Sequence, residues 1–300
     1  MKKRFIAMLL AAVMVLGTFG SAFAMEENDW RIVIGADLTA EERAEVFGLF
    51  GIVEDGLDER RVLTVTNDEE RFYFEGKLPS SEIGRRSISS IYIRALAAGS
   101  GVRVSTHNIN YCTEEMYRSV LATVGITDAE IIVAAPRAVS GTAALTGIYK
   151  AYESLTGSLI SEYAKQAGVE ELLTTGELAE MIGSDEATEV IIELKKILDV
   201  TQTMSDDEVK SSIRSIAEDN DVELSDEQVQ QILTLARTLE GLDVEQIRQR
   251  ALGLANAASG WEKFTEGVKK VVEDIGQFFK DVAEFLRGVF DKFFGGKSNE

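Results

Sequence analysis

The sequence has almost no cysteine or histidine: each occurs once among 300 residues, as Cys112 and His107. A single cysteine excludes an intrachain disulfide. One histidine and one cysteine cannot build a zinc site without carboxylate ligands. Any Ser–His or Cys–His catalytic pair would have to use His107, and we interpret this histidine and the small, apolar Cys112 as structural residues. The sequence therefore predicts no catalytic residue, no metal site and no cofactor.

Motifs of common catalytic and binding sites are also missing. The sequence has neither a G-x-S-x-G nucleophile elbow nor a G-x-x-x-x-G-K-[ST] phosphate-binding loop. Asp219, Asp221 and Glu223 have the alternate spacing of a calcium loop. However, Leu224 stands where that loop needs glycine, and Gln230 stands where it needs a bidentate acid. We interpret this stretch as a solvated turn between helices.

Basic residues are few relative to acidic ones. The chain has 31 lysines and arginines against 51 aspartates and glutamates, a formal net charge of −20. A surface with this excess of negative charge repels the phosphate backbone of nucleic acids. Nucleic acid is therefore not an expected partner.

The N-terminus has the layout of a signal peptide. Residues 2–4 are basic, residues 5–16 are apolar, and small residues stand at Ala22 and Ala24. This order predicts a signal peptide, residues 1–24, that is cleaved after Ala24. The apolar run is shorter than the roughly 20 residues of a membrane-spanning helix. We expect export to the cell envelope or the extracellular space, with three basic residues lost and the net charge changed from −20 to −23.

Strand-like runs are confined to residues 25–155, where they alternate with amphipathic stretches and predict an α/β domain. The runs are Arg31–Ala36, Val62–Thr66, Ser87–Leu96, Val102–Ile109 and Glu130–Ala135. In residues 156–260 apolar positions recur at helical spacing, so we expect an all-α helical bundle. Capping boxes, which mark helix starts, begin at Thr39, Ser205, Ser225 and Asp243. The predicted fold class is mixed, α+β.

Residues 261–294 form a Phe-rich segment whose apolar positions repeat every eleven residues, followed by a polar tail at 295–300. Eleven residues are close to three helical turns, so the apolar stripe stays on one helix face. Such a broad stripe predicts an amphipathic helix that contacts a membrane surface, a second copy of the chain, the protein's own core or another partner. Its large contact residues are Trp261, Phe264, Phe278, Phe279, Phe285, Phe290, Phe293 and Phe294.

Two short segments combine arginine with hydroxyl residues, a pattern that favours an anion site. One is the turn after Arg137, at an expected junction of strand and helix, where backbone N–H groups can bind an anion. The other is the Arg-Arg-Ser stretch that begins at residue 85. The six candidate ligand-binding residues are Arg85, Arg86, Arg137, Ser140, Gly141 and Thr142. The alternatives are a helix N-cap at Ser140 or Thr142 and a plain loop that leads into a strand.

Four stretches together resemble a known family. They are GADLTAEER, IGRRSISSIYI, NINYCTEEMY and PRAVSGTAALTGIYKAYE, spread over roughly residues 30–260. The sequence is similar to the YpuA-like family of exported proteins of Gram-positive bacteria, which is defined by a domain of unknown function. The resemblance implies a cell-envelope or extracellular setting. It supplies no catalytic residues, and the Phe-rich segment lies outside it.

Two functions are compatible with these features. The first is a non-enzymatic secreted or envelope protein that uses residues 261–294 for membrane-surface attachment or self-association. The second is an envelope enzyme or binding protein with an anion or ligand site at the Ser140–Gly141–Thr142 turn, to which Arg137 and either Arg85 or Arg86 would contribute. The sequence names no ligand for that site.

Overall fold

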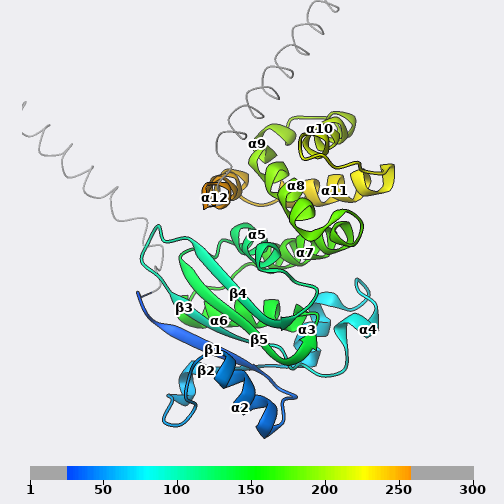
Figure 1. The fold of residues 1–300 in the computed structure, drawn as a ribbon. Coiled ribbons are helices and arrows are strands. Elements are labelled where there is room, and N and C mark those ends of the chain that lie inside the picture. Colours follow the sequence, from blue (N-terminus) through cyan, green and yellow to red (C-terminus); the bar gives the residue numbers. More distant parts are fainter. Residues whose placement is uncertain (1–25, 258–300) are drawn as a thin grey trace, which may run out of the picture. The chain divides into compact units, whose positions relative to one another are not determined.

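The computed structural model describes residues 26–257, which form two compact units (Figure 1). The first unit extends to Thr188 and the second begins at Glu189. The predicted signal peptide and the Phe-rich segment lie outside the described residues. Within residues 26–257, no helix is long and apolar enough to cross a bilayer.

The first unit is built on a five-stranded mixed sheet with the order β2-β1-β3-β5-β4. Strands β1 and β2 are parallel, as are β4 and β5, whereas β3 is antiparallel to both of its neighbours. The strands are β1 (Trp30–Gly35), β2 (Val62–Val65), β3 (Ser90–Ala95), β4 (Val102–Ile109) and β5 (Ala129–Val139). The sheet, together with the helices around it, confirms the mixed α+β class predicted from the sequence.

Strand β5 is longer than the sequence indicated. The β-branched run ends at Ala135, but β5 continues to Val139, which pairs with Ile109 of β4 after a shift in register. Arg137 therefore lies on the strand and not in the turn. The partner strand supplies the extension, since the proline at 136 is a poor strand former by itself.

Strand β3 begins at Ser90, three residues later than predicted. The backbone N–H of Ser87 donates to Asp37 Oδ2 at 2.7 Å, outside any strand pairing. The N–H of Gly35 donates to the hydroxyl of Ser90 at 3.0 Å. Side chains thus satisfy backbone groups that a sheet ladder would otherwise pair, and residues 84–89 are a loop.

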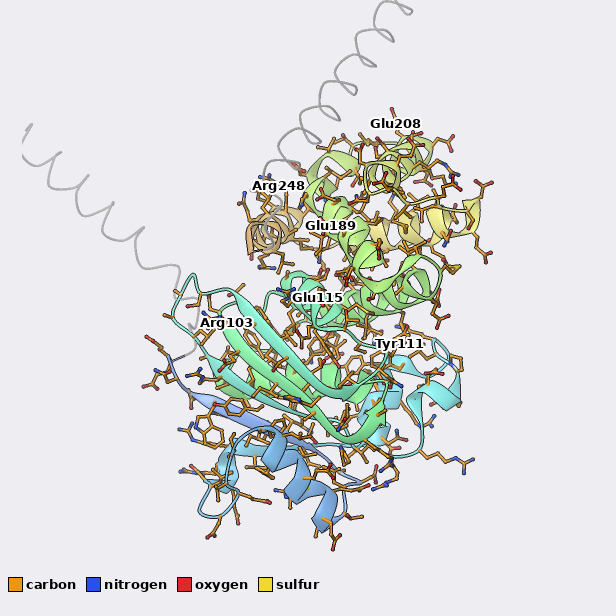
Figure 2. The ribbon with its side chains drawn as sticks, viewed as in Figure 1. Arg103, Tyr111, Glu115, Glu189, Glu208 and Arg248 are labelled. Atoms are coloured by element: carbon orange, nitrogen blue, oxygen red, sulfur yellow. The ribbon has the colours of Figure 1, made fainter. Side chains whose placement is uncertain are left out.

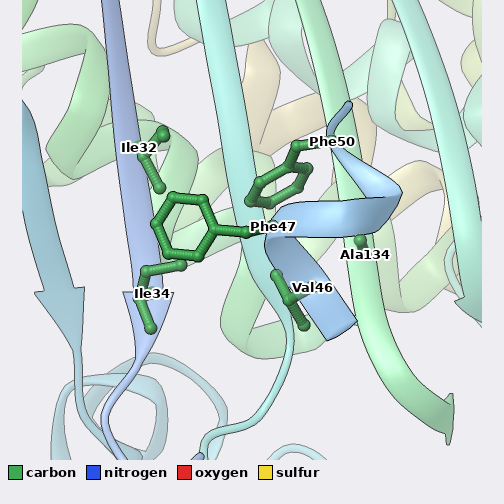
Figure 3. Packing of buried hydrophobic residues seen from close by; sticks show 6 residues of the cluster. All are labelled: Ile32, Ile34, Val46, Phe47, Phe50 and Ala134. Atoms are coloured by element: carbon green, nitrogen blue, oxygen red, sulfur yellow. The ribbon is translucent and has the colours of Figure 1, made fainter. Parts of the chain in front are cut away.

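Alternate residues of the strands face opposite layers. Ile32 and Ile34 point toward α2 (Ala40–Leu49), where they pack against Val46, Phe47 and Phe50 (Figure 3). On the other face α6 (Thr142–Thr156) covers β1 and β3. Its Gly147 lies close to Val33 and Ile91, where a Cβ would be in ordinary van der Waals contact. The inner strands β1 and β3 are therefore covered on both faces.

The remaining helices of the first unit surround this sheet. They are the 3-10 helix η1 (Glu59–Arg61), α3 (Asn67–Phe74), α4 (Ser80–Ile83), α5 (Glu114–Val124) and α7 (Glu162–Ile182). Helix α7 packs on α5, and its Gly168 lies against Val120 and Val124. The unit consequently extends past the boundary at residue 155 that was expected from the last strand-like run.

The second unit is all helical. It contains most of α8 (Ser184–Lys196), then α9 (Leu198–Thr201), α10 (Asp206–Asp219), α11 (Asp226–Leu239) and α12 (Val244–Ala257). The capping boxes predicted at Ser205 and Ser225 are confirmed, as is the box at Thr39 in the first unit. At Asp243 the carboxylate accepts from the N–H of Gln246 at 3.1 Å. The apolar stripe of α11 is buried.

Candidate functional site

The two arginine-containing segments line one cavity of about 410 Å³ in the first unit. Five of the six candidate residues border it: Arg85, Arg86, Arg137, Ser140 and Gly141. The sixth, Thr142, is fully buried just beneath. The sequence allowed the two segments to form one site, and the fold brings the loop before β3 against the end of β5. Glu70, Glu82, Ser89 and Asn110 complete the polar side chains of the lining.

Glu70 of α3 lies at the base of the cavity and is 2% exposed. Its carboxylate accepts a hydrogen bond of 2.6 Å from the hydroxyl of Thr142 and one of 3.1 Å from Asn67 Nδ2. The backbone N–H of Ala143 also donates to it. Burial raises the pKa of Glu70 above its usual value, and these hydrogen bonds act in the opposite direction.

Glu70 thereby caps the start of α6 from another helix. The N-cap residue is Gly141, which has no side chain to do so, and not Ser140 or Thr142 as the sequence allowed. The Glu70 carboxylate receives the backbone N–H of Ala143 at this helix start, where a bound anion would otherwise accept. An intramolecular cap therefore takes the place of an anion at the helix N-terminus, and the arginine side chains remain to bind one.

Three arginines surround the opening, and Glu42 of α2 orients two of them. Glu42 forms ion pairs with Arg86 and, at 2.6 Å, with Nη1 of Arg137. The Arg86 guanidinium is the main cause that lowers the pKa of Glu42 to about 2. Arg85 is exposed, and within the described residues it has no hydrogen bond or ion pair. Arg85 and the remaining N–H groups of Arg137 are thus available to a ligand.

Helix α3 also fixes the arginine loop. Nη2 of Arg71 donates to the carbonyl of Gly84 at 2.6 Å, one residue before Arg85. The same helix therefore holds one wall through Arg71 and the base through Glu70. Neither residue was singled out in the sequence.

Comparison with known proteins places these residues in a family. The family model described as "Protein of unknown function (DUF1002)" matches residues 34–255, which include the whole cavity. The chain belongs to this family. It is 37% identical over 249 residues to "Uncharacterized protein YpuA" of Bacillus subtilis (strain 168), an alignment that covers 82% of this chain and 84% of YpuA. The resemblance stated from the sequence is confirmed, and no solved structure matches.

In this DUF1002 chain Cys112 and His107 differ in environment. Cys112 is buried, and burial raises the pKa of its thiol to about 12. At neutral pH it is therefore a thiol and not the thiolate that nucleophilic catalysis needs. His107 is exposed near the end of β4. Burial of Cys112 agrees with the structural role expected for it, whereas the exposure of His107 assigns this residue no role.

The acidic stretch at Asp219–Glu223 spans the end of α10 and the turn before α11. Among the residues that the structure describes, no group of three histidine, cysteine or acidic side chains converges in a way that could hold a metal ion.

Proposed function

We propose that this DUF1002 protein is an exported, non-enzymatic binding protein of the cell envelope whose cavity holds a small phosphate-bearing ligand. One observation carries the proposal: guanidinium groups from two distant segments border the same cavity in a chain whose net charge is −20. Elsewhere an acidic surface repels anions. The arginines at this opening therefore mark a place on the acidic surface where an anion can approach.

The donor groups at the opening favour phosphate. Arg85, Arg86 and Arg137 bring three guanidinium groups, and Glu42 forms ion pairs with two of them. Glu70 and Glu82 border the same cavity, so its donor geometry and not its net charge selects the ligand. Guanidinium groups bind phosphate oxygens through paired N–H donors, which gives this geometric selectivity.

Removing the available guanidiniums should abolish most of the binding. We expect the variant Arg85→Gln/Arg137→Gln to bind inorganic phosphate at least tenfold more weakly than the unchanged protein, because it loses the charge-assisted hydrogen bonds. Calorimetric titration of the chain without residues 1–24 measures this. The matched control is Arg103→Gln, which removes an exposed arginine from β4 (Figure 2). Equal affinity of the double variant and this control would contradict the proposal.

A second role rests on the eleven-residue apolar repeat of residues 261–294. We propose that this segment attaches the exported protein to a membrane surface or to a second copy. Apolar contact and not charge would drive the attachment, because basic and acidic residues are balanced on its polar positions.

Flotation tests the attachment. The chain without residues 1–24 is expected to float with phosphatidylcholine vesicles, and a variant that ends at Gly260 is expected to stay at the bottom, with light scattering recording self-association. Phe279→Asp/Phe290→Asp should abolish both properties. Lys280→Asp changes the net charge by the same amount at a polar position of the repeat and should float. If all four proteins remain monomeric and fail to float, the segment has neither role.

A further inference from the structure

The hydroxyl of Ser140 borders the cavity, and its hydrogen bonds determine which kind of group it offers to a ligand. Ser140 Oγ lies 3.1 Å from the carbonyl oxygen of Glu82 and 3.0 Å from Oγ1 of Thr142. A carbonyl oxygen only accepts, so the contact with Glu82 uses the proton of Ser140. The contact with Thr142 is decided by Glu70, which lies 2.6 Å beyond it.

In both protonation states of Glu70, the proton of Ser140 is used within the protein. When Glu70 is ionised it only accepts, so Thr142 donates to it, and the proton of Ser140 is directed to Thr142 or Glu82. When Glu70 is protonated it can donate to Thr142, which then donates to Ser140, and Ser140 donates to Glu82. In either state Ser140 has no proton left for the cavity. It therefore presents lone pairs and accepts from a ligand.

A second acceptor borders the same cavity. The carboxylate of Glu82 is exposed on α4, and within residues 26–257 no hydrogen bond or ion pair engages it. Ser140 Oγ lies 3.1 Å from the backbone carbonyl oxygen of Glu82, so the two residues are neighbours in the lining. Among the N–H donors of the lining, those of Arg85 and the remaining ones of Arg137 are available to a ligand. The lining is therefore divided into groups that accept and groups that donate.

We infer that the ligand is a zwitterionic phosphomonoester, a small molecule whose phosphate binds Arg85 and Arg137 and whose ammonium donates to Ser140 and Glu82. This inference rests on the proposed phosphate-binding function and specifies its ligand class. An ammonium fits better than a hydroxyl group, because Glu82 contributes a negative charge in addition to an acceptor. The volume of about 410 Å³ is sufficient for a small molecule of this type.

Two probes that differ in one group test the inference. O-Phosphoethanolamine carries the ammonium, and ethyl phosphate has hydrogen in its place. Titration of the chain without residues 1–24 should give at least tenfold tighter binding of O-phosphoethanolamine, since a charge-assisted hydrogen bond is worth that much or more. In Ser140→Ala and Glu82→Gln the preference should fall to less than threefold. The affinity for ethyl phosphate should change by less than twofold in both variants.

The outcomes separate this inference from the proposed function. If the unchanged protein binds both probes equally, the ligand is not zwitterionic, while the phosphate-binding cavity stands. If O-phosphoethanolamine remains preferred in both variants, Ser140 and Glu82 do not hold the ammonium, and the inference is wrong. If neither probe binds, the proposed function and the inference fail together.

Discussion

Gly141→Ala is expected to lower the free energy of unfolding by about 3 kcal/mol, the sum of a left-handed backbone penalty and a clash in a packed interior. Gly141 has φ of 94°, a conformation that side-chain-bearing residues rarely adopt. A Cβ there would lie 2.5 Å from Oη of Tyr117 and 2.7 Å from Cγ2 of Ile109. Tyr117 is held by its hydrogen bond to the carbonyl of Gly141, so it cannot simply move aside. Urea unfolding followed by circular dichroism measures the loss.

Gly157→Ala is the matched control, because Gly157 ends the same helix with φ of 68° and open space around its Cα. Its cost should be about 1 kcal/mol, from backbone conformation alone. If the two variants lose equal stability, the turn beneath the cavity is not tightly packed against α5, and the described geometry of the site is wrong.

Glu70→Ala should destabilise the protein by about 3 kcal/mol, because it removes the carboxylate that accepts from three donors and caps α6. The donors are the Thr142 hydroxyl, the Asn67 amide and the backbone N–H of Ala143. Glu70→Gln keeps an acceptor oxygen in the same place. The comparison of the two variants by urea unfolding therefore separates loss of the hydrogen bonds from loss of the titrating group.

The Glu70→Gln variant also gives a pH dependence with a defined sign. Burial raises the pKa of Glu70 above 4.5, so between that value and its folded pKa the folded protein keeps a proton that the unfolded chain has released. The wild type then loses stability as pH rises through this range, and glutamine does not. The stability of Glu70→Gln relative to wild type should increase with pH above 4.5. A relative stability that decreases instead would mean that the donors around Glu70 outweigh its burial.

The sequence predicted the parts of this site and allowed them to form one site, but it gave no local evidence that they meet. Runs of β-branched residues located all five strands, and Arg85, Arg137 and Ser140 were singled out because arginine and hydroxyl groups are typical of anion sites. Their meeting depends on a contact between segments about 50 residues apart, which no local spacing reveals. Glu70 had a weaker signal: it shares the buried face of α3 with Tyr73 and Phe74, three and four residues later.

The C-terminal limit of the first unit could not be predicted from local sequence patterns, for a similar reason. In sequence, helix α7 looks like the first helix of the second unit, because strand-like runs are absent from α7 and from the second unit alike. Its docking depends on glycines: a Cβ at Gly176 would lie 2.1 Å from Oη of Tyr111. Gly168 has the same role against α5. Small residues on a helix allow a close approach, but they do not identify the partner surface.

Anomalous diffraction from crystals of the chain without residues 1–24, soaked in tungstate, tests the central claim most directly, since tungstate is a tetrahedral dianion like phosphate and scatters strongly. We expect one strong peak in the cavity, within hydrogen-bond distance of the guanidiniums of Arg85 and Arg137 and away from the helix start that Glu70 caps. Tungstate bound only outside the cavity, or at the start of α6 in place of Glu70, would contradict the account.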